Sequence, residues 1–220
     1  MTIIEDIMGY AVRGGGKYIL LICTVLSGIS AIAGFAPGFG WVAQWLLFGY
    51  FCALYFKVIE TSATGSDEAP EFPEISSLFE DVVQPAFKVI AISAVCFGPA
   101  YVYEMVSGNG EVAMITMGLK AFGYTYFPMA MMAVVCLGYL GAMSPHIVVP
   151  SILRAGGLYW LAVFLLGMLG LAEDFIAAQL SEMPLLFFVV MTLVGAYLLL
   201  TNGRILGIIY RERREEMNWV

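Results

Sequence analysis

Residues 184–220 read PLLFFVVMTLVGAYLLLTNGRILGIIYRERREEMNWV, and this stretch decides the class of fold. Its first twenty residues contain no charged side chain. A helix needs about 20 such residues to cross a hydrocarbon core of roughly 30 Å, so residues 184–203 predict a transmembrane helix. The basic tail that follows, residues 204–220, holds four of the ten cationic residues of the chain: Arg204, Arg211, Arg213 and Arg214.

The composition of the whole chain supports the same class. The 220 residues are 61% hydrophobic and 12% charged, and the mean hydropathy is +0.88. A soluble domain carries about 25% charged residues, so this chain has half the usual charge. The sequence therefore predicts an all-α, polytopic transmembrane bundle that forms one integral membrane domain over residues 1–220.

Apolar runs and their breaks predict about six spans. The boundaries follow turn signals such as Pro37-Gly38 and the acidic stretch at residues 60–85, which holds seven acids and three prolines. Residues 112–143 are too long for one simple span, so Lys120 and Pro128 are expected to divide them into an interfacial piece at 112–122 and a span. The expected spans are 18–36, 41–59, 86–106, 123–143, 152–172 and 184–203.

Two further segments predict short amphipathic helices outside the spans. Residues 2–12 place Ile3, Ile4, Ile7, Met8 and Ala11 on one face, which suits an interfacial helix or, alternatively, a soluble overhang. Within the acidic loop, PEISSLFEDVV predicts a surface helix that leads into the third span. Pro99 predicts a kink in that span.

The distribution of Lys and Arg predicts the orientation. Cationic residues near the ends of spans collect on the cytoplasmic side. With six spans, only Lys120 falls on the opposite side, so both termini and the acidic loop are expected to be cytoplasmic, in a plasma (inner) membrane. The nine residues on the cytoplasmic side are Arg13, Lys17, Lys57, Lys88, Arg154, Arg204, Arg211, Arg213 and Arg214.

Few residues suggest chemistry. The single histidine, His146, lies in SPHIVVPSILR, which is expected to be a loop bounded by Pro145 and Pro150, so it is a weak candidate for a cofactor ligand. The four cysteines lie in different apolar runs without a C-x-x-C pair, so no metal site is expected. Ionisable residues stand at the ends of segments rather than in their middles, which disfavours an ion-coupled transporter. We find no catalytic set and expect no enzyme and no nucleic-acid partner.

Small residues spaced four apart predict close helix contacts. Gly203 and Gly207 form such a pair on the last helix, and Ser27 with Ala31 and Ser30 with Gly34 form two on the first. These contacts could lie within one chain or between subunits.

Two stretches resemble a known group of proteins. FPMAMMAVVCLGYLGAMSPHIVVPSILRAGGLYWLAV (127–163) and GRILGIIYRERREEMNW (203–219) resemble segments of six-helix bacterial membrane proteins, most of them uncharacterised, that are broadly similar to the Yip-type membrane family. The resemblance covers roughly residues 120–220 and carries no catalytic residue.

These observations favour a non-enzymatic membrane subunit or scaffold whose partners are the lipid bilayer and other membrane proteins. The interaction residues expected in the tail are Arg211, Arg213, Arg214 and Trp219. One alternative is a permease-like component that moves a lipid or small apolar solute, because Pro99 and Pro128 interrupt two spans. A second alternative is a subunit that holds a cofactor through His146.

Overall fold

The computed structural model describes residues 3–33, 39–73, 76–107, 113–217 and 219, and over these residues the chain is helical with no strand. The all-α class predicted from the sequence is confirmed. The helices are α1 (Ile3–Tyr10), α2 (Gly16–Ala33), α3 (Phe39–Ala63), η1 (Phe79–Val83), α4 (Gln84–Ser107), α5 (Ala113–Leu137), η2 (Leu140–Met143), α6 (Pro145–Leu180) and α7 (Pro184–Met217).

Five helical segments among the described residues are long and apolar enough to cross a membrane, which identifies a multi-pass architecture. A shorter apolar helix, Gly16–Ser30, lies within α2. The five are Gly40–Ala63, Phe79–Ser107, Met114–Leu137, Pro145–Leu180 and Leu186–Met217.

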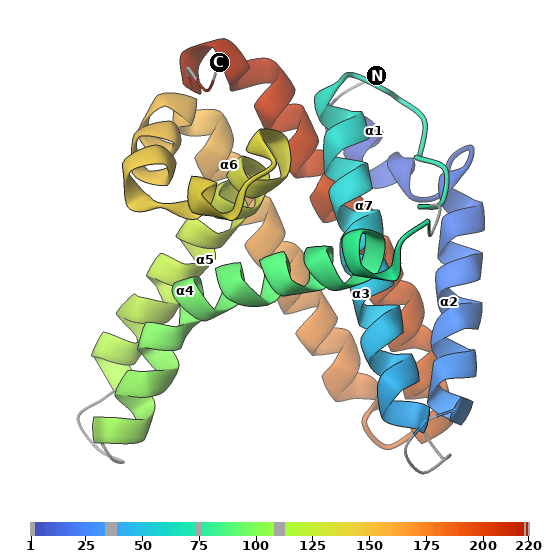
Figure 1. The fold of residues 1–220 in the computed structure, drawn as a ribbon. Coiled ribbons are helices and arrows are strands. Elements are labelled where there is room, and N and C mark those ends of the chain that lie inside the picture. The colour runs from blue at the N-terminus through green and yellow to red at the C-terminus, as the bar shows by residue number, and fades with distance from the viewer. Residues whose placement is uncertain (1–2, 34–38, 74–75, 108–112, 218, 220) are drawn as a thin grey trace.

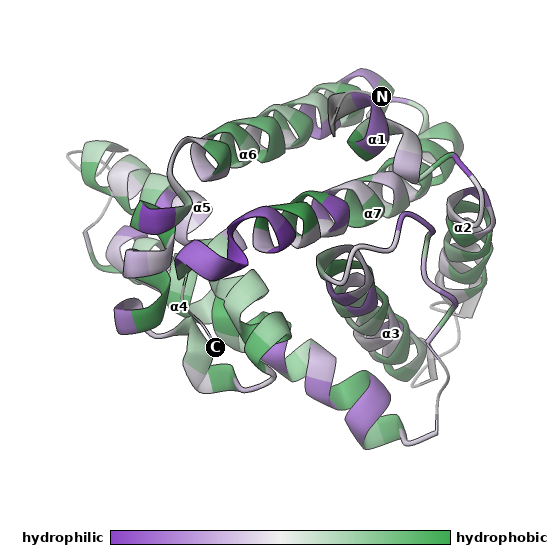
Figure 2. Ribbon diagram, turned by 90° about the horizontal axis from the view of Figure 1, so that it is seen from above, coloured by the Kyte–Doolittle hydropathy of each residue, from purple (hydrophilic) through white to green (hydrophobic). Residues whose placement is uncertain are grey.

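The helices form a bundle with two distinct ends (Figure 1). At one end lie α1, the last turns of α7, the first part of α6 and the connection after α3. At the other end, called the far end below, α2 and α4 finish, α3 and α5 begin, and α6 meets α7. Seen from above, hydrophilic residues gather at the end of α7, around α1 and along the connection after α3 (Figure 2). The first end is therefore the polar one.

The core lies around α5. Residues 129–134 of this helix are each no more than 1% exposed, so the helix is covered on every side there. Such a segment must be apolar all round, and MAMMAV meets that condition. Helices α3, α4, α6 and α7 contribute the surrounding side chains, including Ile59, Ile92, Ala155 and Ile205.

Two helix breaks predicted within residues 112–143 are absent from the described residues. Ala113–Leu137 is one helix that contains both Lys120 and Pro128. A proline inside a membrane helix is tolerated where packing and neighbouring groups compensate for its missing N–H, and Pro128 directly precedes the fully buried segment. The expected separate piece at 112–122 is thus the first part of α5, with residue 112 outside the described residues.

The predicted loop at residues 144–154 is also helical, because α6 begins at Pro145 after Ser144. Proline fits the first position of a helix, since its missing N–H would have no partner there. The real interruption is Gly156, whose φ of 61° and ψ of −141° are not helical. It divides α6 into a first part that lies across the polar end and a second part that descends to the far end (Figure 1).

The segment before α4 is a short π-helix rather than a separate amphipathic helix. Asp81 accepts hydrogen bonds from the backbone N–H groups of Ser76 and Ser77, both at 2.8 Å, and so fixes the entry to η1. Val82 is buried, whereas Phe79 is exposed; Ile75 lies outside the described residues. Helix α4 changes direction along its length (Figure 1), and Pro99 lies inside it, as a proline-induced bend requires.

The helix predicted at the N-terminus is confirmed as α1. Ile7 and Ala11 are buried, Met8 is 37% exposed, and the side chains of Ile3 and Ile4 lie outside the description. At the other terminus, α7 continues past Gly203 to Met217, so the predicted tail is mostly an extension of the last span.

The glycine pair on α7 packs inside the chain. A Cβ atom on Gly203 would lie 2.7 Å from a Val58 methyl carbon, and one on Gly207 would overlap the Ser62 Cβ. Helices α3 and α7 therefore approach as closely as small residues permit. The pairs predicted on the first helix include Ala31 and Gly34, which lie outside the described side chains.

Candidate functional site

Arg204 is the most unusual side chain of the molecule. It lies on α7 at the polar end, one residue after Gly203, and none of its side chain is exposed. A buried guanidinium is costly unless it is paired and hydrogen-bonded, so its surroundings must compensate for the lost hydration.

Arg204 reaches two carboxylates from distant parts of the chain. Its Nη2 atom lies 2.8 Å from Asp6 Oδ2 on α1 and 2.8 Å from Asp67 Oδ1 in the connection after α3, and its Nε lies 3.3 Å from Asp6 Oδ2. Its Nη1 donates to the Ser66 carbonyl oxygen. The Tyr10 ring covers the guanidinium, with its centroid 4.9 Å from the Cζ atom. We call Arg204, Asp6, Asp67, Ser66 and Tyr10 the clasp.

The clasp is buried on one side and open to solvent on the other. The Asp67 side chain is 79% exposed, whereas the guanidinium that it binds is fully covered. The hydrogen bond from Arg204 and its positive charge lower the pKa of Asp67. Burial raises the pKa of the Tyr10 hydroxyl. The Asp67 carboxylate is therefore held in its ionised form beside Arg204.

Additional contacts join α1 to α7 and to the connection after α3. The Tyr197 hydroxyl donates to the Met8 carbonyl at 3.0 Å, and the Tyr10 hydroxyl donates to the Glu68 carbonyl at 3.4 Å. Helix α1 and the acidic connection are thus fastened together on one helix. The clasp is a structural joint.

Three other cationic residues also bind main-chain carbonyls. Lys57 donates to Phe72 at 3.4 Å, Lys88 to Gly138 at 3.1 Å and Arg154 to Met217 at 3.1 Å. The partners are 15, 50 and 63 residues apart in the sequence, respectively. These cations, which contribute to the predicted orientation, therefore also fasten separate segments of the chain.

The predicted interaction residues of the tail divide into two groups. Arg211 and Arg213 form ion pairs with Glu212 and Glu216, and Arg214 is exposed in the last turns of α7. Trp219 instead turns back onto α6: its indole Nε1 donates to Ser151 Oγ at 2.7 Å, and its ring lies 5.5 Å from that of Tyr210. The tail is docked on the first part of α6.

His146 lies in the first turn of α6 and is exposed, with Ser144 Oγ 3.5 Å from its Nε2. The predicted loop position is wrong, for the reason given above for Pro145. Among the described residues no group of three His, Cys, Asp or Glu side chains could hold a metal ion. The four cysteines are free, and three of them are buried: Cys23, Cys52 and Cys96.

Charged residues near the far end have a different character. Lys120 Nζ lies 2.7 Å from Glu104 Oε1, and both side chains are about 40% exposed, at 43% and 39%. Glu173 and Asp174 lie side by side on α6, seven and six residues before its end at Leu180. No hydrogen bond or ion pair joins either carboxylate to another of the described residues.

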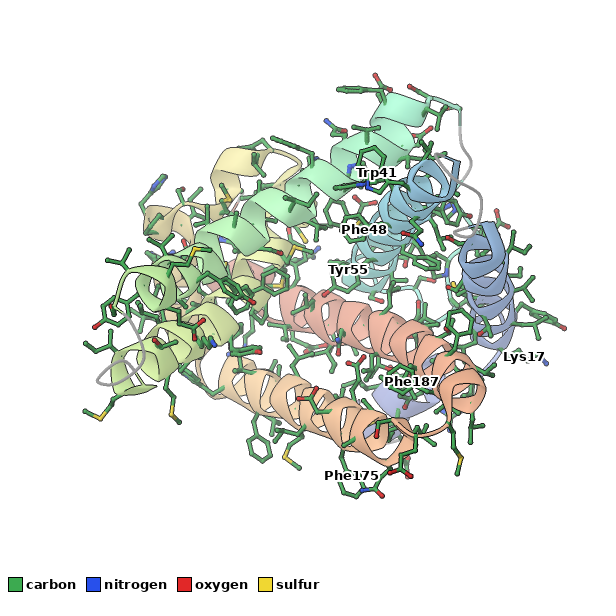
Figure 3. All side chains as sticks on the ribbon, turned by 90° about the horizontal axis from the view of Figure 1, so that it is seen from below. Lys17, Trp41, Phe48, Tyr55, Phe175 and Phe187 are labelled. Carbon is green, nitrogen blue, oxygen red and sulfur yellow. The ribbon has the colours of Figure 1, made fainter. Side chains whose placement is uncertain are left out.

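A groove opens on the side of the bundle between α3 and α4. It has a volume of about 310 Å³ and is lined by Trp41, Gln44, Trp45, Phe48 and Ile90. Trp41, Phe48 and Tyr55 follow one another along α3 when the molecule is seen from the far end (Figure 3). Four of the five lining side chains are aromatic or aliphatic, and Gln44 contributes an amide group.

Sequence reasoning found the positions of the tail cations but missed the clasp and the groove. A signal for the first was present: Arg204 is separated from the other tail cations by the apolar run ILGIIY, which continues the helix. Nothing in the sequence around Arg204 indicates that it pairs with Asp6 and Asp67.

Comparison of the chain with protein-family models, curated proteins and solved structures finds no match. The resemblance to the Yip-type membrane family stays a prediction.

Proposed function

We propose that this chain is a non-enzymatic, integral membrane subunit or scaffold that binds another membrane protein through the second part of α6. One observation carries the proposal: only 6% of the most apolar window of α6 is buried within the chain. This helix leaves its face uncovered, although α7 packs along its other side.

The uncovered face has a regular pattern. Large apolar side chains recur at alternating spacings of three and four residues, which is the repeat of packed helix pairs. Gly167 and Gly170 lie on the same helix, and nothing would obstruct a Cβ at either position, so a neighbouring helix could approach closely. The exposed series is Leu161, Phe164, Met168, Leu171 and Phe175.

Charge favours a protein over lipid at this face. Glu173 and Asp174 lie between Leu171 and Phe175 of the exposed series, and they have no cationic partner among the described residues. At the end of a span, carboxylates without an internal partner favour pairing with a cation of a protein neighbour. The partner is therefore a membrane helix with Lys or Arg at the matching depth.

A photo-crosslinking residue tests the proposal. We expect a crosslinker at Phe164 or Phe175 in native membranes to yield one adduct with a protein of defined mass. The double substitution Glu173→Gln, Asp174→Asn should lower the yield of this adduct. The control position is Phe122, an exposed aromatic residue on α5, which should yield lipid adducts. Lipid adducts alone at all three positions would exclude the scaffold function.

The proposal includes an orientation with six spans and both ends of the chain in the cytoplasm of a bacterial-type plasma membrane. The split of nine cations against Lys120 supports it, and α1 and the end of α7 lie at the same end of the bundle (Figure 1). Reporter fusions after residue 220 and within residues 64–73 should report cytoplasm, whereas a fusion at Glu182 should report the opposite side. A cytoplasmic signal at Glu182 would contradict this topology.

A permease-like function is the second candidate, and the groove under the bent helix α4 favours it. Reconstituted vesicles distinguish the two functions, because only a permease-like protein would accelerate movement of a labelled lipid between leaflets.

A further inference from the structure

The groove between α3 and α4 has a continuous aromatic wall. Trp41, Gln44, Trp45 and Phe48 occupy positions i, i+3, i+4 and i+7 of α3, so their side chains share one helix face. The rings of Trp41 and Trp45 lie 6.1 Å apart and those of Trp45 and Phe48 lie 6.0 Å apart, both in edge-to-face contact. Ile90 of α4 completes the lining.

The groove is closed at one end. Directly after Phe48, a Cβ atom on Gly49 would lie only 2.5 Å from the Val82 carbonyl oxygen, so the backbone of η1 crosses α3 in direct contact. The η1–α4 segment crosses the middle of α3, and α3 runs from this crossing to the far end, where it begins (Figure 1). We call this segment the ceiling of the groove.

Both walls belong to candidate membrane spans, Gly40–Ala63 and Phe79–Ser107. The groove therefore faces the hydrocarbon region, where acyl chains are the abundant apolar groups. Tryptophan is enriched where a span meets the headgroups, and Trp41 stands at the beginning of α3. The Gln44 amide adds a hydrogen-bond donor within the wall.

We propose that this groove binds one acyl chain of a phospholipid from the leaflet at the far end. The headgroup lies beside Trp41, the Gln44 amide donates to an ester carbonyl, and the end of the chain lies beneath α4. Binding is independent of the scaffold function, because it uses a different face of the molecule.

The dimensions favour a lipid chain over a helix from a second copy. From Trp41 to the crossing at Gly49 the wall spans eight residues, or about 12 Å at 1.5 Å per residue. A spanning helix needs about 30 Å of uninterrupted length and a diameter of about 10 Å. The ceiling would block such a helix, whereas a flexible chain can end there.

Bound lipid can be counted directly. The protein is purified in a mild detergent and studied by native mass spectrometry as wild type, as Ile90→Trp, which fills the groove, and as Leu161→Trp, which adds the same bulk to the exposed face of α6. Wild type and Leu161→Trp should retain one phospholipid per chain, and Ile90→Trp should bind it about tenfold more weakly. Equal retention in all three proteins, or a dimer in place of the lipid adduct, would overturn the proposal.

A fluorescence titration provides a second test that does not alter the groove. In a Trp160→Phe, Trp219→Phe variant, emission comes from the two groove tryptophans. Phosphatidylglycerol brominated on one acyl chain should quench it saturably at one lipid per protein, and unlabelled phosphatidylglycerol should reverse the effect. Quenching that rises linearly without saturation shows only bulk lipid contact and rejects the site.

Discussion

The two ends of this bundle are held together by different kinds of contact. At the polar end, Arg204 is fully buried and binds α1 and the acidic connection at once, while Arg154 binds the Met217 carbonyl. At the far end, the ion pair between helices among the described residues is Lys120 with Glu104, and it is largely exposed. Polar cross-links therefore fix one end, whereas apolar packing alone shapes most of the other.

The difference shows how one sequence can combine a rigid part with accessible faces. A buried, multiply bonded charge favours one arrangement of segments, because any alternative leaves the charge without partners. Exposed apolar faces impose no such requirement and remain free for lipid or protein. Two such faces, on the second part of α6 and along the groove, lie toward the far end from the clasp.

Removing both carboxylates of the clasp should have the largest effect. Asp6→Ala with Asp67→Ala leaves Arg204 buried without a counter-charge, which costs about 3–5 kcal/mol of stability. Fluorescence-detected unfolding in detergent measures the change. The matched variant at the far end, Glu104→Ala, should cost about 0–1 kcal/mol. Similar losses of stability in the two variants would contradict the difference between the polar end and the far end.

Alanine substitutions of glycine compare a closed helix contact with an open face. Gly207→Ala forces a Cβ against Ser62 and the Ile59 carbonyl and should destabilise the protein by about 1–3 kcal/mol. Gly167→Ala meets nothing within 4 Å and should stabilise α6 by about 0.5–1 kcal/mol. The two changes in unfolding free energy should therefore have opposite signs. A neutral Gly207→Ala would indicate that α3 and α7 separate easily.

The docking of the tail predicts a smaller effect. Trp219→Phe retains an aromatic ring near Tyr210 but removes the hydrogen bond to Ser151, at a cost of about 0.5–1.5 kcal/mol. The control is Trp160→Phe, at an exposed position on α6. Protease accessibility of the last residues should increase in the first variant alone. Unchanged protease accessibility in Trp219→Phe would show that the hydrogen bond of Trp219 does not hold the tail in place.

The pH dependence of the clasp should be the smallest effect, because Asp67 is mostly exposed. Its pKa lies below the ordinary value of 3.8, so its contribution to stability is present above about pH 4 and is lost as the pH falls through the folded-state value. The difference in melting temperature between wild type and Asp67→Asn should therefore shrink between pH 6 and pH 3. A constant difference would show that ionisation of Asp67 does not matter.

The sequence predicts the helical class and the approximate positions of the apolar segments because those depend on local composition. Boundaries are less predictable, since Pro128 and Pro145 are compatible with helix once their surroundings are known. The positions of the tail cations could also be predicted. The clasp could not, because Arg204 lies 198 positions from Asp6 and 137 from Asp67, and nothing in the intervening residues specifies the pairing.

That separation has a consequence for synthesis of the protein. Asp6 emerges from the ribosome 198 residues before its partner Arg204. At about 5–20 residues per second, the delay is roughly 10–40 s. During that interval Asp6 lacks Arg204, so α1 can join the clasp only after all the residues between the two have been made.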